Sequence, residues 1–298
     1  MSYSKSRTEA QVRLAKWLAK RKLSTQMRIG RVLGCLLYYF PNSRKAIART
    51  NISICFPDLN RQQAKKLLKQ NLISTGQGLM EMLAALWVEQ EQVVGQFDVV
   101  GLDHLIDVMK SGQGCLLLSC HTTSIEWGIR GLNHELKAIQ VPVGHMLARQ
   151  HNNKLLEAHL ETARLSFVEK LIDKKNIRSL LASIKSGHPV YYAPDQNFSY
   201  QIKFADFFGR PAATTIGTYK LSQKKVKVMP WFCFRTGPCQ WRIEILPEIT
   251  MLKDMGEQGA LDHINQLFEQ QIKNHPEQYL WVHRRFKNQP EGLSKPYR

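Results

Sequence analysis

From residue 97 onward, short apolar runs alternate with stretches of helical periodicity, and this alternation constrains the fold more than any other feature. The apolar runs read FDVVG, CLLLSC, IQVPVGHML, PVYYAPD, VKVMPWFCF and WRIEIL. Helical stretches lie between or after them at 102–111, from about 123, and at 152–165, 176–186 and 258–274. Strands that are apolar at nearly every position are typical of sheets covered by helices on both faces. The sequence therefore predicts an α/β fold with a mixed, largely parallel sheet flanked by helices.

The first quarter of the chain is set apart by its charge. Residues 1–70 hold 16 Lys and Arg and two acidic residues, so they carry +14 of the formal +18 of the whole 298-residue chain. The run 8–22 predicts a helix with one apolar face, formed by Ala10, Leu14, Trp17 and Leu18. Two interpretations stay open: this face inserts at a membrane interface, or it packs on the protein's own core.

These differences predict two parts. Residues 1–90 form a basic, helical region that is membrane-associated and packed on the core, with a second helix at 59–87 that is apolar on several sides. Residues 91–298 form the α/β domain. No run reaches the length of a membrane span: IGRVLGCLLYYF has only a dozen residues and contains Arg31. No apolar segment of a secretory signal is visible in the first 26 residues.

A histidine and a glutamate follow the CLLLSC run. His121 lies directly after the predicted strand, and Glu126 comes five residues later, in the first turn of the next helix. Ligands of α/β sheets collect at the carboxyl ends of strands. The Glu126 carboxylate could take the Nδ1 proton of His121 and leave Nε2 free as a general base. Such a dyad suits the deprotonation of a hydroxyl that attacks an activated acyl carbon. A capped surface helix is the alternative.

Several blocks carry a resemblance to a known family. They read NISICFPDL, HTTSIEWG, YYAPDQ, FFGRPAATTIGT and PEQYLWVHRRFK. Together they resemble the late acyltransferases of bacterial lipid A biosynthesis, the lauroyl- and myristoyltransferases of Kdo-lipid A precursors, within the lysophospholipid acyltransferase superfamily. The resemblance spans roughly residues 28–290. It implies transfer of a fatty acyl chain from acyl carrier protein, or sometimes acyl-CoA, to a hydroxyl of an attached hydroxyacyl chain.

The resemblance also implies substrate-binding residues. Arg149 and Arg164 are candidates to hold the anionic head of the lipid A precursor, and the alternative is two surface arginines on a basic protein. Asp195, after the PVYYA run, could orient a sugar hydroxyl or organise Arg149. ARQHNNKL keeps Arg149 and the Asn152–Asn153 pair but lacks the two prolines usual in the family. Thr214 and Thr215 could bind the headgroup or cap a helix, and Arg284 and Arg285 could be structural or could face the acidic carrier protein.

Neither a metal nor a cofactor is predicted. His145, His151, His159 and His188 lack partners at zinc-like spacing, no dinucleotide or phosphate loop is present, and a thioester is already activated. The predicted partners are acyl carrier protein, a lipid A precursor and an anionic membrane surface, and the predicted location is the cytoplasmic face of the inner membrane, peripheral or monotopic.

Three alternative functions remain to be compared with this assignment. A glycerolipid or mannolipid acyltransferase is disfavoured by the late blocks. A basic nucleic-acid-binding protein fits the charge but lacks a helix-turn-helix, RNP or zinc-finger pattern, so no nucleic acid is predicted. A soluble esterase lacks the G-x-S-x-G elbow.

Overall fold

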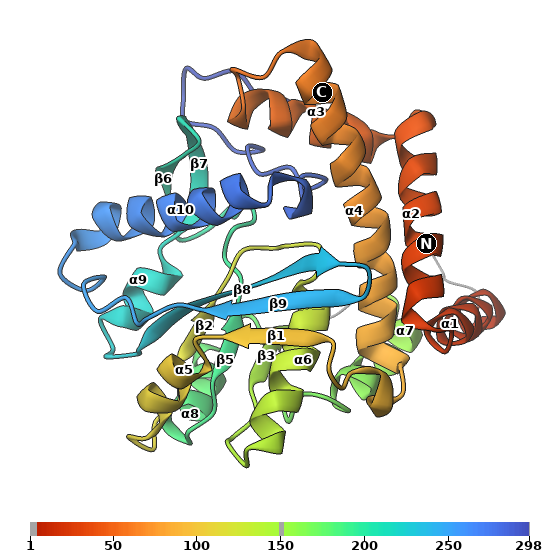
Figure 1. The fold of residues 1–298 in the computed structure, drawn as a ribbon. Coiled ribbons are helices and arrows are strands. Elements are labelled where there is room, and N and C mark those ends of the chain that lie inside the picture. The colour runs from red at the N-terminus through yellow and green to blue at the C-terminus, as the bar shows by residue number, and fades with distance from the viewer. Residues whose placement is uncertain (1–4, 149–151, 298) are drawn as a thin grey trace.

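A computed structural model describes residues 5–148 and 152–297 and confirms the α/β prediction (Figure 1). Within these residues, seven strands form one sheet in the order β1-β9-β8-β2-β5-β3-β4, and the β8–β9 pair is antiparallel whereas the other neighbouring pairs are parallel. The strands are β1 (Phe97–Val100), β2 (Leu116–Leu118), β3 (His145–Ala148), β4 (Leu171–Asp173), β5 (Val190–Tyr192), β8 (Val228–Gly237) and β9 (Gln240–Ile245). A separate antiparallel hairpin comprises β6 (Ile202–Phe207) and β7 (Arg210–Thr215).

Among the described residues, four helices precede the sheet and six lie among or after its strands. The first four are α1 (Lys5–Ala19), α2 (Leu23–Tyr39), α3 (Ser43–Cys55) and α4 (Arg61–Trp87). The others are α5 (Leu102–Met109), α6 (Ile125–Ala138), α7 (Lys154–Arg164), α8 (Ile177–Lys185), α9 (Gly217–Ser222) and α10 (Gly256–Asn274), with short 3-10 turns η1 (Gln90–Gln92) and η2 (Pro276–Gln278). Within the described residues, none of them has the length and apolarity needed to cross a bilayer.

The core has two halves because β2 is buried on both faces. Leu116 and Leu118 point into one apolar cluster, which α8, α9 and α10 help to form. Leu117 points into the other, together with residues of α5 and α6. Successive side chains of a strand alternate between faces, so a run of consecutive apolar residues is what a doubly covered strand requires.

The long helix α4 joins the amino-terminal helices to the sheet. Its amino end carries a capping box, in which the Asn60 side chain accepts from the main chain of Gln63 and the Gln63 side chain accepts from Asn60. Beside it, α2 runs closely along α4 (Figure 1). Gly34 makes this approach possible, because a Cβ atom there would overlap with the α4 backbone at Leu72 and Ile73.

A buried ion pair fixes α4 to the sheet. Glu81 of α4 accepts from Nε of Arg235 at 2.5 Å and from Nε1 of Trp241 at 2.9 Å. The side chains of Glu81 and Arg235 are 1% and 10% exposed. The helix therefore has a defined position at the edge of the sheet where β2, β5 and β8 end. The division of the chain at residues 90 and 91 stays a prediction.

Candidate active site

His121 lies just past the carboxyl end of β2, as predicted, and its partner comes from the neighbouring strand β5. Nδ1 of His121 lies 2.5 Å from Oδ1 of Asp195, and the main-chain N–H of His121 donates to Oδ2 of the same carboxylate at 3.0 Å. Because β2 and β5 pair in parallel, residues that follow the two strands meet at one edge of the sheet. The carboxylate fixes the tautomer with the proton on Nδ1 and leaves the lone pair on Nε2.

Asp195 is held as an anion in a buried position. The hydroxyl of Tyr279 donates to its Oδ2 at 2.9 Å, so the carboxylate accepts three hydrogen bonds. Burial alone would raise the pKa of Asp195, but the charge of His121 and these hydrogen bonds outweigh it and lower the pKa to about 2. In turn, burial lowers the pKa of His121, and the Asp195 carboxylate more than reverses this, so that the pKa is raised. The pair makes the imidazole a stronger base.

The imidazole of His121 is partly exposed to solvent, unlike its partner carboxylate. The side chain of His121 is 28% exposed, whereas that of Asp195 is 2% exposed. Nε2 of His121 has no hydrogen-bond partner among residues 5–148 and 152–297. This nitrogen is therefore available to a hydroxyl from a bound substrate.

The amino-terminal helices position Tyr279 from two sides. Nδ2 of Asn71, on α4, donates to the carbonyl of Tyr279 at 2.7 Å. Asn51, on α3, donates to the carbonyls of Trp281 and His283. Two of the quoted blocks, NISICFPDL and PEQYLWVHRRFK, thus contact each other directly. The second block contains Tyr279, which is the third donor to the Asp195 carboxylate. Sequence reasoning missed Tyr279, whose only signal was its place inside that block.

The expected contact between Glu126 and Nδ1 of His121 is not present, since Asp195 holds that nitrogen. Glu126 instead accepts from Nε of Arg164, the last residue of α7, at 2.7 Å, and both side chains are largely buried, at 13% and 15% exposed. The reason is geometric: Glu126 is the second residue of α6 and faces α7, whereas the strand β5 brings Asp195 beside the imidazole. The contact between Asp195 and His121 was not expected from the sequence, and the expectation that Asp195 serves a sugar hydroxyl or Arg149 stays a prediction.

The remaining predicted site residues have different outcomes. Arg149 lies outside the described residues. Arg285 is buried and donates to the carbonyl of Ala213 and the hydroxyl of Thr214, so both Arg285 and Thr214 stabilise the hairpin's contact with the carboxyl-terminal segment. The hydroxyl of Thr215 accepts from the main chain at Gly217 at 3.2 Å, next to the start of α9.

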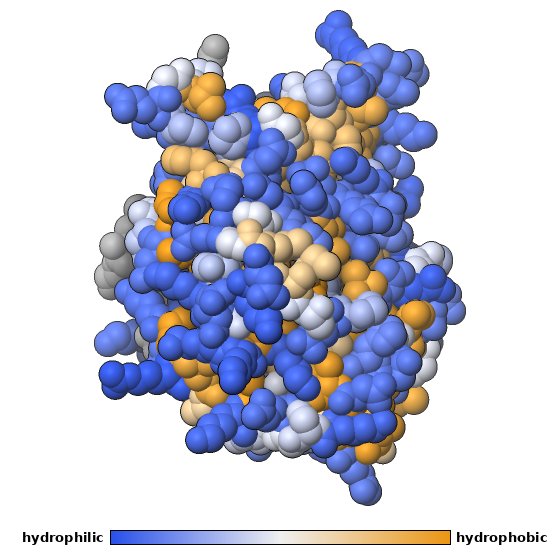
Figure 2. Space-filling model, turned by 90° about the vertical axis from the view of Figure 1, so that its left-hand side faces the viewer, coloured by the Kyte–Doolittle hydropathy of each residue, from blue (hydrophilic) through white to orange (hydrophobic). Residues whose placement is uncertain are grey.

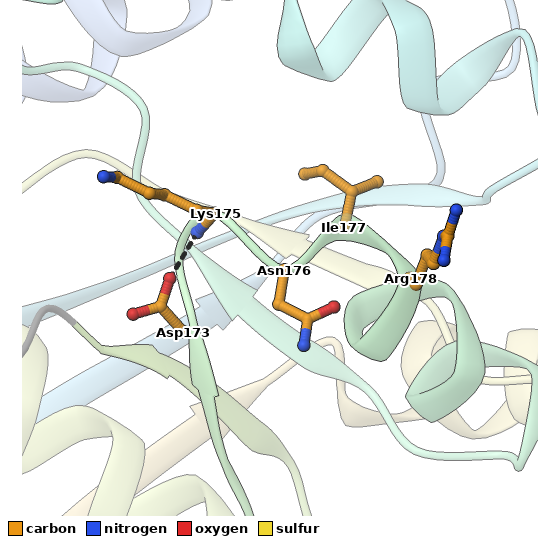
Figure 3. Close-up of a pocket in the computed structure, with 5 residues that line it drawn as sticks. All are labelled: Asp173, Lys175, Asn176, Ile177 and Arg178. Carbon is orange, nitrogen blue, oxygen red and sulfur yellow. Dashed lines mark hydrogen bonds between the residues drawn. The ribbon is translucent and has the colours of Figure 1, made fainter.

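A polar hollow of about 560 Å³ lies farther along the same edge of the sheet (Figure 3). It is lined at the end of β4 and the start of α8 by Asp173, Lys175, Asn176, Ile177 and Arg178. Lys175 and Arg178 point in opposite directions, and Oδ1 of Asp173 accepts from the main chain of Lys175 at 2.8 Å. Its five lining residues include no histidine and no thiol, unlike the His121–Asp195 pair at the ends of β2 and β5.

Comparison with known proteins then decides the family. Residues 12–288 match the model of the bacterial lipid A biosynthesis acyltransferases. The chain belongs to this family. It is accordingly an O-acyltransferase of lipid A biosynthesis, as the blocks indicated. Three relatives from Escherichia coli K12 align over nearly the whole chain. The lipid A biosynthesis palmitoleoyltransferase is 32% identical over 275 residues, which cover 90% of this chain and 87% of the relative.

The lauroyltransferase of lipid A biosynthesis is 30% identical over 275 residues, covering 91% of this chain and 88% of the relative. The myristoyltransferase is 23% identical over 276 residues, covering 91% and 82%. The names of these three acyltransferases specify three different acyl chains on a shared pathway.

Several large apolar side chains are exposed on α1 and on α2. Trp17 on α1 is 54% exposed, and Val32, Leu36 and Tyr39 form a stripe on α2 with 58%, 47% and 65% exposed. The core-facing side of α1 is a different one, which includes Val12 at 3%. The alternative in which the Trp17 face packs on the core is therefore wrong. By contrast, the side of the molecule shown in Figure 2, where β6 lies in Figure 1, is mostly hydrophilic with scattered apolar residues.

Proposed function

We propose that this chain transfers a fatty acyl group from acyl carrier protein to a hydroxyl of a hydroxyacyl chain on a lipid A precursor, with His121 as general base and Asp195 as its orienting partner. The contact between Nδ1 of His121 and Asp195 carries this proposal, together with the free and accessible Nε2. A hydrogen bond from the acceptor hydroxyl to Nε2 would place the proton on the imidazole as the oxygen attacks the thioester carbonyl.

The proton and charges balance within this scheme. Attack forms a C–O bond and gives a tetrahedral intermediate, while His121 becomes an imidazolium that the Asp195 carboxylate stabilises. Collapse of the intermediate breaks the C–S bond, and the imidazolium returns the proton to the departing thiolate. Because the acceptor supplies its own hydroxyl and the donor is already activated, the step requires no nucleophile from the protein.

The Glu126–Arg164 pair would bind the anionic head of the acceptor. Glu126 engages Nε of Arg164, and the two terminal nitrogens of Arg164 have no hydrogen bond to any other residue that the structure describes. A guanidinium with a free terminal fork matches a phosphate or carboxylate. Glu126 would thus be a positioning residue that aims Arg164 at the anionic head of the acceptor, with Arg149 as a further proposed contact.

The membrane would be reached through the α1–α2 surface, defined by Trp17, Val32, Leu36 and Tyr39. Basic residues flank these apolar side chains, including Lys16, Arg21, Arg28 and Arg31, all exposed. A surface of aromatic and aliphatic side chains with adjacent Lys and Arg suits an anionic membrane interface. The acyl chains of the acceptor lie in a bilayer. The helix α4 packs on α2 and borders one side of the sheet edge that carries the His121–Asp195 pair. We therefore place the enzyme on the cytoplasmic face of the inner membrane, where acyl carrier protein is found.

Vesicle co-sedimentation tests this docking. Trp17→Ser should weaken binding to anionic vesicles on the order of tenfold, because one large aromatic group no longer leaves water. Met251→Ser is the matched control, since Met251 is 51% exposed but lies outside this surface. High salt should weaken the binding of the wild type. Equal losses for the two variants would rule out the α1–α2 surface as the docking site.

The reaction itself is tested by product analysis. Purified protein is incubated with a Kdo-lipid A precursor and either acyl carrier protein or CoA as the donor of the same acyl chain, and the lipid is analysed by mass spectrometry. The proposal predicts one added acyl ester on a hydroxyacyl chain and faster transfer from acyl carrier protein. Transfer from CoA alone would overturn the donor assignment, and an acyl group on a sugar hydroxyl would overturn the acceptor assignment.

A further inference from the structure

Two histidines and a glutamate meet at the edge of the sheet opposite to His121. His145 is the first residue of β3, Glu169 precedes β4 by two residues, and His188 precedes β5 by two residues. These three strands are parallel, so their amino ends share one edge, while the catalytic pair lies past the carboxyl ends. One ligand atom from each of the three side chains lies within 4.8 Å of the other two.

His145 has no partner for its polar atoms in this position. The residue is 5% exposed, and neither ring nitrogen accepts or donates a hydrogen bond within the described part of the chain. A buried polar group that stays unpaired destabilises the fold by about 1–3 kcal/mol. A buried, isolated imidazole is neutral, so one of its nitrogens carries a lone pair that a cation could use.

The hydrogen bond of its Nδ1 atom leaves His188 able to bind a cation through Nε2. Its Nδ1 lies 3.0 Å from the carbonyl oxygen of Val143, to which it donates. This bond leaves the lone pair on Nε2, and a backbone carbonyl that holds one ring nitrogen is the usual support of a metal-bound histidine. Oε2 of Glu169 lies 3.6 Å from Nδ1 of the same ring, and the Glu169 side chain is 60% exposed, so a negative charge sits at the mouth of the cluster.

We propose that His145, Glu169 and His188 form a binding site for a divalent transition-metal ion, of which Zn²⁺ is the best fit. Two imidazoles and one carboxylate are a common zinc ligand set, with a water completing the tetrahedron. The site would link the starts of β3, β4 and β5, and it is structural because it lies at the edge away from the reaction.

Binding requires a modest rearrangement of the rings. The two imidazoles are stacked, with centroids 4.1 Å apart and planes 17° apart, whereas lone pairs in the ring planes must converge on the ion. Tetrahedral bonds of about 2.0–2.1 Å bring ligand atoms to about 3.4 Å from one another. The rings must therefore turn apart, and the spacing between ligand atoms must shorten from its present upper limit of 4.8 Å.

The test measures zinc binding directly on untagged, chelator-treated full-length protein. Equilibrium dialysis against ZnCl₂ should show one site that is lost, or weakened at least about tenfold, in His188→Ala and in Glu169→Gln. Zinc should also raise the thermal unfolding temperature of the wild type and not of these variants. The matched control is His159→Ala, which removes a histidine that lies 3.5 Å from Glu9 but outside the cluster.

Each result decides the proposal. Loss of zinc binding in the two cluster variants, with retention in His159→Ala, supports it. Absence of zinc binding by the wild type, or undiminished binding by His188→Ala, overturns it. The unfolding curve without zinc shows whether each variant is folded, and Glu169→Gln, at an exposed position, changes the charge with little effect on packing.

Discussion

Replacing Asp195 by Asn tests the most specific feature of the site. The carboxylate accepts from Nδ1 of His121 through Oδ1, and from the His121 main chain and the Tyr279 hydroxyl through Oδ2. An amide has one acceptor oxygen. If this oxygen takes the position of Oδ2, it accepts from the main-chain N–H of His121 and from the Tyr279 hydroxyl. The NH₂ group of the amide then faces Nδ1 of His121. The imidazole must move its proton to Nε2, and the general base is lost.

The other amide orientation is also unfavourable, because the NH₂ group would oppose the main-chain N–H of His121. Inversion of the tautomer, with loss of the anion that stabilises the imidazolium, lowers kcat by about 10²–10⁴ in comparable triads. This corresponds to about 2.7–5.5 kcal/mol in the activation free energy. Tyr279→Phe removes one of three donors to the Asp195 carboxylate and should lower kcat by about tenfold, which corresponds to the lower end of the range of about 1.5–3 kcal/mol for a hydrogen bond to a charged group.

The pH profile separates this mechanism from a general loss of structure. Asp195 raises the pKa of His121 because a negative charge favours the imidazolium. The reaction needs the neutral base, so the rate of the wild type should rise with pH through that pKa and then level off. Without the carboxylate the pKa falls, and the residual activity of Asp195→Asn should rise at a lower pH.

The assay is steady-state acyl transfer at saturating donor and varied acceptor concentration, with thermal unfolding as the control for folding. Glu126→Gln keeps Asp195 as the Nδ1 partner of His121, so the pH at which its rate rises should not change. Its main effect should be a higher KM for the acceptor, because Glu126 positions Arg164. A folded Asp195→Asn variant with turnover within about threefold of the wild type, alongside a hundredfold loss of kcat in Glu126→Gln, would refute this reasoning and restore Glu126 as the orienting group.

Two further predictions concern the attachment of the amino-terminal helices. Gly34→Ala should lower the free energy of unfolding by about 1–3 kcal/mol, because its Cβ atom overlaps with α4; Gly259→Ala, whose Cβ atom meets its nearest neighbour at 3.4 Å, should be neutral or stabilising by up to about 1 kcal/mol. Denaturant unfolding that shows equal effects would contradict the tight α2–α4 contact. Glu81→Gln should destabilise by about 3–5 kcal/mol, because it leaves a buried guanidinium without its counter-ion. Asp98→Asn, which breaks an exposed pair with Arg242, should cost less than about 1 kcal/mol, and a similar cost for both variants in the same assay would argue against the buried pair.

The sheet could be predicted because its strands are apolar at consecutive positions and are separated by helices of clear period. Elements without such a pattern were missed. The strand β4 reads LID with Glu169 and Lys170 before it and two lysines after it, so no apolar run marks it. The helix α3 ends within a block that carries a motif but no clear helical period. The β6–β7 hairpin turns at Phe208 and Gly209, both with positive φ, of 55° and 74°. Asn-Gly or Asp-Gly is the usual signal of such a turn, and a phenylalanine there gives none.

The candidate site was predictable at one residue and not at its partner. His121 is found from local sequence, because a polar residue after a buried strand lies at the ligand-binding edge. The choice between Glu126 and Asp195 depends on strand order, and sequence spacing favours the nearer carboxylate. Asp195 is 74 residues away along the chain and reaches the imidazole only because β2 and β5 are neighbours. The same holds for His145 and His188, which parallel pairing brings together without any metal-ligand spacing.

Mass spectrometry of lipid A tests the central claim most directly. Cells that carry the wild-type gene are compared with cells that carry His121→Ala and with cells that lack the gene, at matched protein levels for the two alleles. The account predicts a lipid A heavier by one ester-linked acyl chain with the wild type, and the lighter lipid A of the gene-deleted cells with His121→Ala. The heavier lipid A in cells with the His121→Ala allele, or its absence in cells with the wild type, would contradict the account.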